Sequence, residues 1–299
     1  MRKFIGLTLP PSLTEDQIQT IAENCGDDIL AIITERLDSP AERPWRIKWL
    51  VVATGGGEIQ LGENDFKVEE IDDTIDWVAR SLENFKPFTI GSFLIFGTHS
   101  RSDLLKPEIN KPDLLKSDTV IPLQIDATTA FGTGQHPTTE GCLKALEYLK
   151  ARKMSPGQIL DMGAGTAILA IAAAKIWPQS RTTAIDIDPD SIRVAREQIS
   201  NNDVDHQIQA FTGDGFQAPE ICQSAGYDLV LANILAKPLR HMAADLCLSM
   251  KPGGFAVLSG LLQAQEENVL NTYLNCGLKL EKRFPVQDWS TLVLEKPLI

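Results

Sequence analysis

The fold of this chain follows from one stretch of sequence, Ile159-Leu160-Asp161-Met162-Gly163-Ala164-Gly165-Thr166. Its apolar start predicts a buried strand, and Gly163 and Gly165 predict a tight turn whose backbone amides can approach a ligand before an apolar helix begins. A second apolar strand ends in Asp186. This arrangement is typical of a nucleotide-type cofactor site, in which the acidic side chain accepts hydrogen bonds from a ribose.

Two residues near the turn indicate the kind of cofactor. Dinucleotide sites follow the pattern G-x-G-x-x-G/A, and the third small position is here Ile168. Asp161 would repel a pyrophosphate, whereas it could receive the ammonium group of an amino-acid cofactor. The sequence therefore favours S-adenosylmethionine, bound near Asp161, Gly163, Gly165 and Asp186. A tight turn with a capping aspartate is the alternative that needs no ligand.

From about residue 158 onward, strands and helices alternate as in a doubly wound, Rossmann-like α/β sheet. The last two strands have no helix between them, which resembles the end of the seven-stranded sheet of class I methyltransferases. Strands are expected at Gln158–Asp161, Thr182–Asp186, Gln207–Phe211, Asp228–Ala232, Ala256–Ser259, Lys279–Phe284 and Thr291–Leu294. Helices are expected at Pro137–Lys150, Ile168–Ile176, Pro189–Asn201, Lys237–Met250 and Gln263–Leu274, with Lys251-Pro252-Gly253-Gly254 as a stop signal.

The beginning of the chain has a different pattern, which predicts a small α+β domain over residues 1–75. Residues 76–125 contain several aromatic side chains and then a stretch rich in proline, lysine and aspartate, and they are expected to form an interdomain segment and connector. Residues 126–299 are expected to form the cofactor-binding domain. Within the first domain, strands are expected at Lys3–Leu9, Ile29–Thr34, Arg46–Ala53 and Phe66–Ile71, with a helix over Leu13–Asn24.

Composition limits the class of protein. The formal net charge of −12 argues against sequence-specific or phosphate-directed binding of nucleic acid and favours a basic protein partner. The five cysteines are scattered and lack C-x-x-C spacing, so neither a disulfide framework nor a metal site is expected. Neither a signal peptide nor a membrane-spanning segment is recognisable, and a cytoplasmic protein is expected.

The loop before the first of these helices is rich in glycine and hydroxyl residues: Asp126–Thr139 reads D-A-T-T-A-F-G-T-G-Q-H-P-T-T. A flexible backbone with many small donors, delivered to a helix N-terminus, predicts a clasp for the carboxylate of an amino-acid cofactor. Its candidate contacts are Phe131, Thr133 and Thr139. Helix capping by a threonine is an equally simple interpretation, and His136 is expected to be a structural hydrogen bonder rather than a base.

Four segments, in this order, closely resemble the ribosomal protein L11 methyltransferase family of class I enzymes. They are Phe131–Thr139, Asp161-x-Gly163-x-Gly165, Asp186-Ile187-Asp188-Pro189 and Ala232-Asn233-Ile234-Leu235-Ala236-Lys237-Pro238-Leu239. The resemblance covers roughly residues 77–299 and includes Leu258-Ser259-Gly260-Leu261-Leu262 at the end of the fifth strand. It implies a class I methyltransferase catalytic domain with S-adenosylmethionine in contact with Thr139, Gly163, Asp186 and Asn233.

The resemblance also implies a leading ferredoxin-like β-α-β-β-α-β domain that grips ribosomal protein L11, free or on the large subunit. In this chain Gly55–Asp65 is too short for the second helix of such a unit, so a loop is expected there. The substrate therefore stays open between L11 and another basic protein.

Asn233 is the expected catalytic residue. It follows the strand Asp228–Ala232 at the carboxyl edge of the sheet, where its amide can orient the cofactor and accept a hydrogen bond from an amine. Enzymes that methylate planar nitrogens resemble one another in an aromatic residue after this position, and Ile234-Leu235-Ala236 supplies no ring. A lysine or N-terminal amine is therefore the expected substrate. The structural alternative for Asn233 is an N-cap of the helix near Lys237.

Two other classes of protein stay open. A nucleotide-binding oxidoreductase would need a small residue in place of Ile168 and has no use for Asp161. A non-catalytic adaptor would bind the cofactor without turnover, but the Asn233 turn and the threonine-rich loop argue against it.

Overall fold

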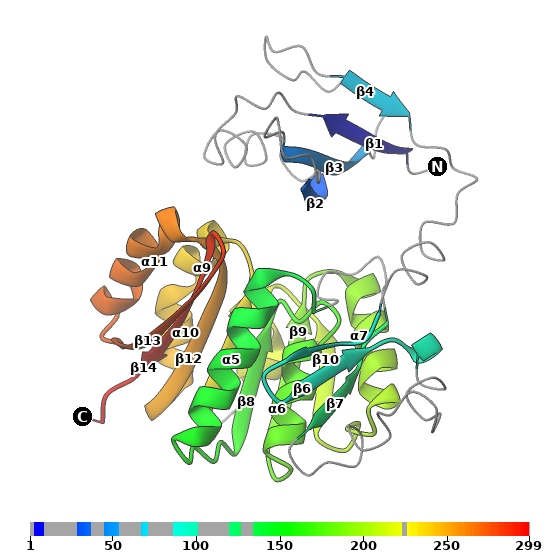
Figure 1. Cartoon of the computed structure of the whole chain (residues 1–299). Helices are drawn as coiled ribbons and strands as arrows, with labels where there is room; N and C mark the ends of the chain where they lie inside the picture. Colours follow the sequence, from blue (N-terminus) through cyan, green and yellow to red (C-terminus); the bar gives the residue numbers. More distant parts are fainter. Residues whose placement is uncertain are drawn as a thin grey trace. The chain divides into compact units, whose positions relative to one another are not determined.

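The structure is a computed structural model that describes residues 3–8, 29–36, 45–53, 67–70, 86–100, 120–126, 134–222 and 226–298. The chain divides into two compact units, Met1–Asp76 and Trp77–Ile299 (Figure 1). The first unit contains a four-stranded sheet, and the second contains a seven-stranded and a three-stranded sheet.

The sheet of the first unit has the strand order β2-β3-β1-β4, with each neighbouring pair antiparallel. Its strands are β1 (Lys3–Thr8), β2 (Ile29–Arg36), β3 (Trp45–Ala53) and β4 (Lys67–Glu70). The four predicted strands are confirmed, and their order is that of a ferredoxin-like sheet. The predicted helix Leu13–Asn24 and the predicted loop Gly55–Asp65 lie outside the described residues.

The large sheet of the second unit has the order β10-β9-β8-β11-β12-β14-β13. Its strands are β8 (Gln158–Met162), β9 (Arg181–Asp186), β10 (Ile208–Thr212), β11 (Tyr227–Asn233), β12 (Met250–Leu262), β13 (Lys279–Val286) and β14 (Trp289–Glu295). Strands β8 to β12 are parallel, and β14 is antiparallel to both of its neighbours. The predicted doubly wound sheet with a terminal hairpin is therefore confirmed. Because the chain continues from β8 to β9 on one side and returns to β11 on the other, the topological switch point lies between β8 and β11.

Helices cover both faces of this sheet (Figure 1). One face packs against α5 (Pro137–Ala151), α6 (Ile168–Ile176) and α7 (Pro189–Asn201), and its apolar core includes Ile159 and Leu231. The other face packs against α8 (Pro219–Cys222), α9 (Ala236–His241), α10 (Ala243–Ser249) and α11 (Gln263–Asn275), and its core includes Leu160 and Val230. Since side chains alternate along a strand, Asp161 and Asn233 face the side of α5 to α7.

Two elements differ from the sequence expectation. The helix predicted over Lys237–Met250 is two helices, α9 and α10, which are separated at Met242. The strand predicted over Ala256–Ser259 is much longer, because β12 already begins at Met250 and includes the stretch Lys251–Gly254 that we expected only to stop a helix. A register irregularity against β11 accommodates this stretch.

A small three-stranded sheet precedes α5, and the sequence patterns did not indicate it. Strands β5 (Phe88–Ile90) and β6 (Phe93–Phe96) form a hairpin, and β7 (Ile121–Gln124) pairs parallel to β6. Phe93 and Leu123 are fully buried in the core shared with α5, α6 and α7. The small sheet is therefore part of the same packed unit as the large one.

Side chains at the C-terminal end of α7 and at its C-cap, Asn202, pair with the outer edge of β7. The Gln124 N–H donates to Asn202 Oδ1 at 3.0 Å, and Asn202 Nδ2 donates back to the Gln124 carbonyl at 2.7 Å. The Asp126 N–H donates to Gln198 Oε1 at 3.1 Å. Both amide side chains are buried, so the Gln124 backbone groups and the Asp126 N–H are satisfied without a further strand.

Among the described residues, no helix has the length and hydropathy needed to span a membrane. The same part of the chain contains no group of histidine, cysteine, aspartate or glutamate side chains arranged to hold a metal ion.

Candidate cofactor site

The candidate residues of β8, β9 and β11 come together at the carboxyl edge of the sheet. The last register pair of β8 and β11 joins Met162 to Ala232, so Asn233 stands next to Gly163 across the switch point. The pairing of β8 with β9 also extends to Met162, which puts Asp186 beside the same glycine on the other side. Three segments that are distant in the sequence thus meet where ligands bind in open α/β sheets.

The glycine turn folds back onto β9. The N–H groups of Gly163 and Ala164 donate to the Ile185 carbonyl at 2.8 and 3.0 Å, and the Gly165 N–H donates to Asp186 Oδ2 at 2.8 Å. Gly163 and Gly165 have φ values of 71° and 53°, in the region that favours glycine. The backbone N–H groups of the glycine turn, which we expected to face a ligand, thus donate to β9. They are not free to bind the oxygens of a pyrophosphate.

Asp161 caps the helix that follows the turn. Its side chain is buried, and Oδ2 accepts a hydrogen bond from the Ala170 N–H in the first turn of α6 at 2.9 Å. Burial and, to a smaller extent, the charge of Asp186 raise the pKa of Asp161 to about 7, against the opposing effect of the Ala170 hydrogen bond. A carboxyl group therefore lies at the helix N-terminus, where a dinucleotide phosphate would bind. A cationic ligand fits beside these two acidic groups better than an anionic one.

Thr139 and Asn233 each carry a buried oxygen without a hydrogen-bond partner. In the described part of the chain, the buried side-chain polar atoms that make no hydrogen bond are Thr139 Oγ1, Asn233 Oδ1 and Thr182 Oγ1. Thr182 lies near the start of β9, at the opposite end of that strand from Asp186. An unpaired buried polar atom costs roughly 1–3 kcal/mol, and a ligand that supplies the missing partner removes this cost. The two oxygens at the carboxyl edge therefore indicate a ligand site.

The first turn of α5 is held on the same edge of the sheet. Ser259 Oγ on β12 donates to the Thr138 carbonyl at 3.2 Å. Ser259 is also the register partner of Asn233 on β11, and paired residues of parallel strands point to the same face. Thr139, next to Thr138, and Asn233 therefore belong to one side of the sheet.

His136 is the N-cap of α5, which no threonine caps. Its Nδ1 accepts a hydrogen bond from the Thr138 N–H at 3.3 Å and lies 2.7 Å from Thr138 Oγ1. The ring packs edge-on against Trp289, with 4.8 Å between ring centroids. Burial lowers the pKa of His136 to about 4. The neutral ring thus acts as a structural hydrogen bonder, as the sequence indicated.

Phe131 and Thr133, the other two expected contacts of the loop, lie outside the described residues. The end of the loop is described from Gly134, which has a φ of 92°. A Cβ at this glycine would lie 3.2 Å from Ile168 Cδ1, so the loop ends close against the start of α6.

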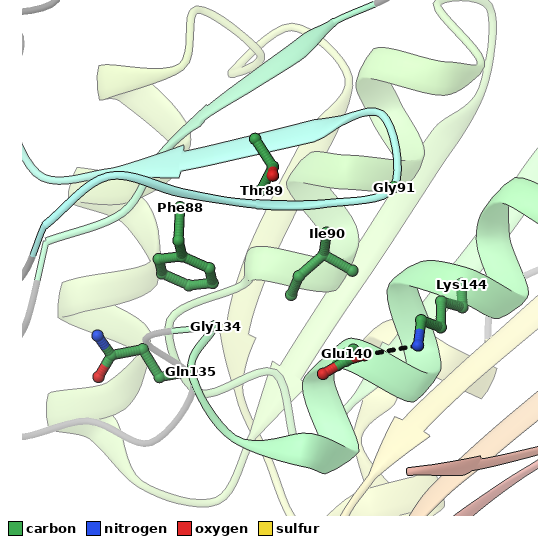
Figure 2. Close-up of a pocket in the computed structure, with 8 residues that line it drawn as sticks. All are labelled: Phe88, Thr89, Ile90, Gly91, Gly134, Gln135, Glu140 and Lys144. Atoms are coloured by element: carbon green, nitrogen blue, oxygen red, sulfur yellow. Dashed lines mark ion pairs between the residues drawn. The ribbon is translucent and has the colours of Figure 1, made fainter.

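An open pocket of about 290 Å³ lies beside this end of the loop (Figure 2). It is lined by Phe88, Thr89, Ile90, Gly91, Gly134, Gln135, Glu140 and Lys144. Glu140 and Lys144, one turn apart on α5, form an ion pair of 2.5 Å along one side of the pocket. Asp161, Asp186 and Asn233 do not line the pocket, so it is separate from these three candidate residues.

The turn after Asn233 packs over the glycine turn. A Cβ at Gly163 would lie 2.2 Å from Ile234 Cγ2, which leaves no room for a side chain. The N-cap position of α9 is Leu235, so the alternative in which Asn233 caps this helix is wrong. Leu235 is 52% exposed, and an apolar surface therefore adjoins Asn233 at the edge of the sheet.

Comparison with known proteins extends the sequence resemblance. The family model described as "Ribosomal protein L11 methyltransferase (PrmA)" matches residues 23–297. The match begins within the first unit, so the expected extent, residues 77–299, was too short. The ribosomal protein L11 methyltransferase of Bradyrhizobium diazoefficiens is 39% identical over 259 residues, which are 87% of this chain and 81% of that protein. That of Brucella suis (strain ATCC 23445 / NCTC 10510) is 39% identical over 235 residues, 79% of this chain and 77% of the relative.

The fold is also that of a solved relative. The structure of ribosomal protein L11 methylase from Lactobacillus delbrueckii subsp. bulgaricus aligns with a TM-score of 0.58 at 20% identity, over 71% of this chain and 98% of that one. The extent of the family match, the identity to the curated relatives and the shared fold lead to one conclusion: this chain is a methyltransferase and belongs to the ribosomal protein L11 methyltransferase family.

Proposed function

We propose that this protein transfers methyl groups from S-adenosylmethionine to lysine or N-terminal amines of ribosomal protein L11. The observation that carries the proposal is the pair of buried, unpartnered oxygens, Thr139 Oγ1 and Asn233 Oδ1, on one side of the sheet. The names of the curated relatives support L11 as the substrate. A ribosomal substrate would place the reaction in the cytoplasm.

The residues of the carboxyl edge suit an amino-acid nucleoside. Asp186 would accept hydrogen bonds from the ribose, Asp161 would receive the ammonium group, and Thr139 Oγ1 would donate to the carboxylate. Phe131 and Thr133 are proposed to complete the clasp from the loop. Bound S-adenosylmethionine supplies an electrophilic methyl group on a sulfonium, and the neighbouring acidic groups favour its positive charge.

Asn233 would position the nucleophile. Its Oδ1 can accept one N–H of the target amine, which fixes the direction of the nitrogen lone pair. A lysine with a pKa of about 10.4 is neutral in only about one molecule in a few thousand at neutral pH. The exposed apolar side chain of Leu235, two residues after Asn233, favours the free amine by removing water. Positioning and desolvation then suffice without a strong general base.

A different basic protein is the second candidate substrate, because the net charge of −12 suits any basic partner. An oxidoreductase that binds a dinucleotide is disfavoured, since the amides of the glycine turn donate to β9 and Asp161 occupies the start of α6.

The cofactor is tested by calorimetry with two matched variants. Thr139→Val and Thr182→Val each remove a buried hydroxyl that has no partner, but only Thr139 lies at the proposed site. Loss of one hydrogen bond to a charged group predicts that Thr139→Val weakens S-adenosylmethionine binding by about tenfold to a hundredfold. Thr182→Val should bind like the wild type. Binding of NAD in place of S-adenosylmethionine would reject the proposal.

The substrate and the catalytic residue are tested by methyl transfer. Labelled methyl groups should enter purified L11, and Asn233→Ala should abolish transfer while its far-ultraviolet circular dichroism stays that of the wild type. Label that enters another protein of a whole lysate but not L11 would establish the second candidate. Normal turnover by Asn233→Ala would remove Asn233 from the mechanism.

A further inference from the structure

Ser259 and Gly260, adjacent residues of β12, contact both halves of the candidate site. Ser259 is fully buried, and its Oγ donates to the Thr138 carbonyl and lies 2.7 Å from Thr291 Oγ1. Thr138 directly precedes Thr139. The hydroxyl of Ser259 therefore fixes the helix turn that carries the unpartnered Thr139 Oγ1.

Gly260 contacts the turn after Asn233, which is the other half of the candidate site. Its φ is 86°, and a Cβ at this position would lie 2.2 Å from the Ile234 carbonyl oxygen, 2.6 Å from its carbon and 3.0 Å from its nitrogen. The backbone of Ile234 thus packs directly against the α-carbon of Gly260, which carries no side chain. Because Ile234 directly follows Asn233, any side chain at Gly260 must push the Asn233 turn away from β12.

The contact between α5 and the sheet is close on the Ser259 side as well. A Cβ at Gly141, in the first turns of α5, would lie 2.2 Å from Thr291 Oγ1. Cys142, the next residue, is fully buried in the same contact. A hydroxyl network without room for larger groups therefore sets the position of the helix start.

We propose that Ser259 and Gly260 are positioning residues that set the separation of Thr139 and Asn233, Ser259 through the first turn of α5 and Gly260 through the turn after Asn233. This inference rests on the proposed function. It assigns separate effects to neighbouring residues: Ser259 controls cofactor affinity, and Gly260 controls the rate of transfer.

Ser259→Ala is tested against Ser180→Ala. Ser180 is also a buried serine that donates to a backbone carbonyl, that of Trp177 at 2.8 Å, but it precedes β9 at the far end of the sheet. Both variants should lose a similar amount of thermal stability. Only Ser259→Ala should raise the Kd for S-adenosylmethionine, by about tenfold, with kcat changed much less.

A double-mutant cycle separates positioning from general damage. If Ser259 acts through Thr139, adding Ser259→Ala to Thr139→Val should weaken binding no further. If Ser259→Ala does not fold, Thr291→Val is used instead, because it removes the second hydrogen-bond partner of the Ser259 hydroxyl. Thr291→Val should weaken cofactor binding, whereas Thr291→Ser, which keeps a hydroxyl at this position, should bind like the wild type.

Gly260→Ala is tested against Gly277→Ala. Gly277 has a φ of 90°, but a Cβ there would meet nothing within 4 Å, so this control carries the same backbone strain without the contact. Gly260→Ala should lower kcat for L11 methylation by about a hundredfold, since a displacement of the Asn233 turn near 1 Å is costly. Gly277→Ala should keep its kcat and lose only stability.

Three outcomes are distinguishable. Cofactor affinity that falls in Ser259→Ala alone, together with a kcat that falls in Gly260→Ala alone, supports the positioning role. A wild type that binds and transfers normally, with both variants equal to their controls, overturns the positioning role and leaves the proposed function intact. A wild type that does not bind S-adenosylmethionine overturns both.

Discussion

Asp161→Asn is expected to remove a pH dependence from the stability of this protein. Burial raises the pKa of Asp161 from 3.8 to about 7. The unfolded chain therefore releases this proton at a lower pH than the folded chain does. Stability contributed by the protonated carboxyl is complete below about pH 4, is lost progressively as the pH rises to about 7, and is constant above that. An asparagine keeps an acceptor for the Ala170 N–H but cannot ionise.

The magnitude follows from the difference between the two pKa values. One pKa unit corresponds to about 1.4 kcal/mol, so the complete loss is about 4 kcal/mol. In a measurement from about pH 5 to about pH 8, stability is lost over the two pH units between pH 5 and the folded pKa of about 7. The difference in unfolding free energy between variant and wild type should therefore widen by about 3 kcal/mol in favour of the variant. The groups that act electrostatically with Asp161 are the Asp186 carboxylate and the buried Cys142 thiol. Burial raises the pKa of Cys142 to about 12, so this thiol adds no proton transition in this window.

Urea unfolding of both proteins at a series of pH values measures this gap. A cationic cofactor beside Asp161 should also lower its pKa, so that binding releases a proton near pH 6 from the wild type and none from Asp161→Asn. Calorimetry in two buffers of different ionisation enthalpy counts that proton. Parallel stability profiles for the two proteins would refute the buried, protonated carboxyl, and equal proton release would refute its contact with the ammonium group.

Three further changes test other parts of the site. Gly163→Ala should weaken S-adenosylmethionine binding by at least about tenfold, because its Cβ would lie 2.2 Å from Ile234 Cγ2, whereas Gly215→Ala, with nothing within 4 Å, should bind normally in the same titration. His136→Asn keeps a capping acceptor but removes a side chain whose pKa burial lowers to about 4. Because of this low pKa, the wild type should lose up to about 2 kcal/mol of unfolding free energy between pH 7 and pH 5, and the variant should lose less by that amount in urea unfolding. An unchanged pH profile would contradict the burial of the ring. Glu147→Ala removes the carboxylate that accepts both the N–H and the hydroxyl of Ser92 in the β5–β6 turn, at 2.5 and 2.6 Å, and should increase amide hydrogen exchange in that hairpin without changing kcat; exchange equal to that of the wild type would show that the bond does not hold the hairpin.

Elements with strong terminal signals could be predicted to the residue. The helix Pro189–Asn201 agrees with its prediction because Asp188 and Pro189 form a recognisable start, and Asp188 accepts the N–H groups of the first turn in the structure. The helix Ile168–Ile176 also agrees, since its apolar run is bounded by the glycine turn and Pro178. Local chemistry decides where such elements begin and end.

Elements that depend on distant partners could not be predicted. Nothing near Met242 signals the break between α9 and α10, because the sequence there contains neither glycine nor a new cap. The strands Phe88–Ile90 and Ile121–Gln124 are short, and their stability comes from burial against α5, α6 and α7. Periodicity over three or four residues carries too little information to reveal them.

The candidate site also combines features that the local sequence indicates with features that depend on distant partners. Residue types indicated Asp161, Asp186 and the loop with Thr139, and the family resemblance indicated Asn233; the sheet brings their strands and helix to one edge. The hydrogen bonds that commit the glycine amides to β9 depend on where β9 lies, which the local pattern does not specify. The segment that contains Ser259 resembled the family in sequence, but nothing in it indicated a role for this serine, because that role depends on its register beside Asn233.

The amide side chains of Gln198 and Asn202 also have a consequence for how this protein behaves at high concentration. An open strand edge can template pairing with a neighbouring chain, which leads to aggregation. Asn202 and Gln198 occupy the places that such an incoming strand would take along β7. Two uncharged side chains therefore block strand pairing at this edge, and apolar replacements there would leave the Gln124 backbone groups and the Asp126 N–H without their partners.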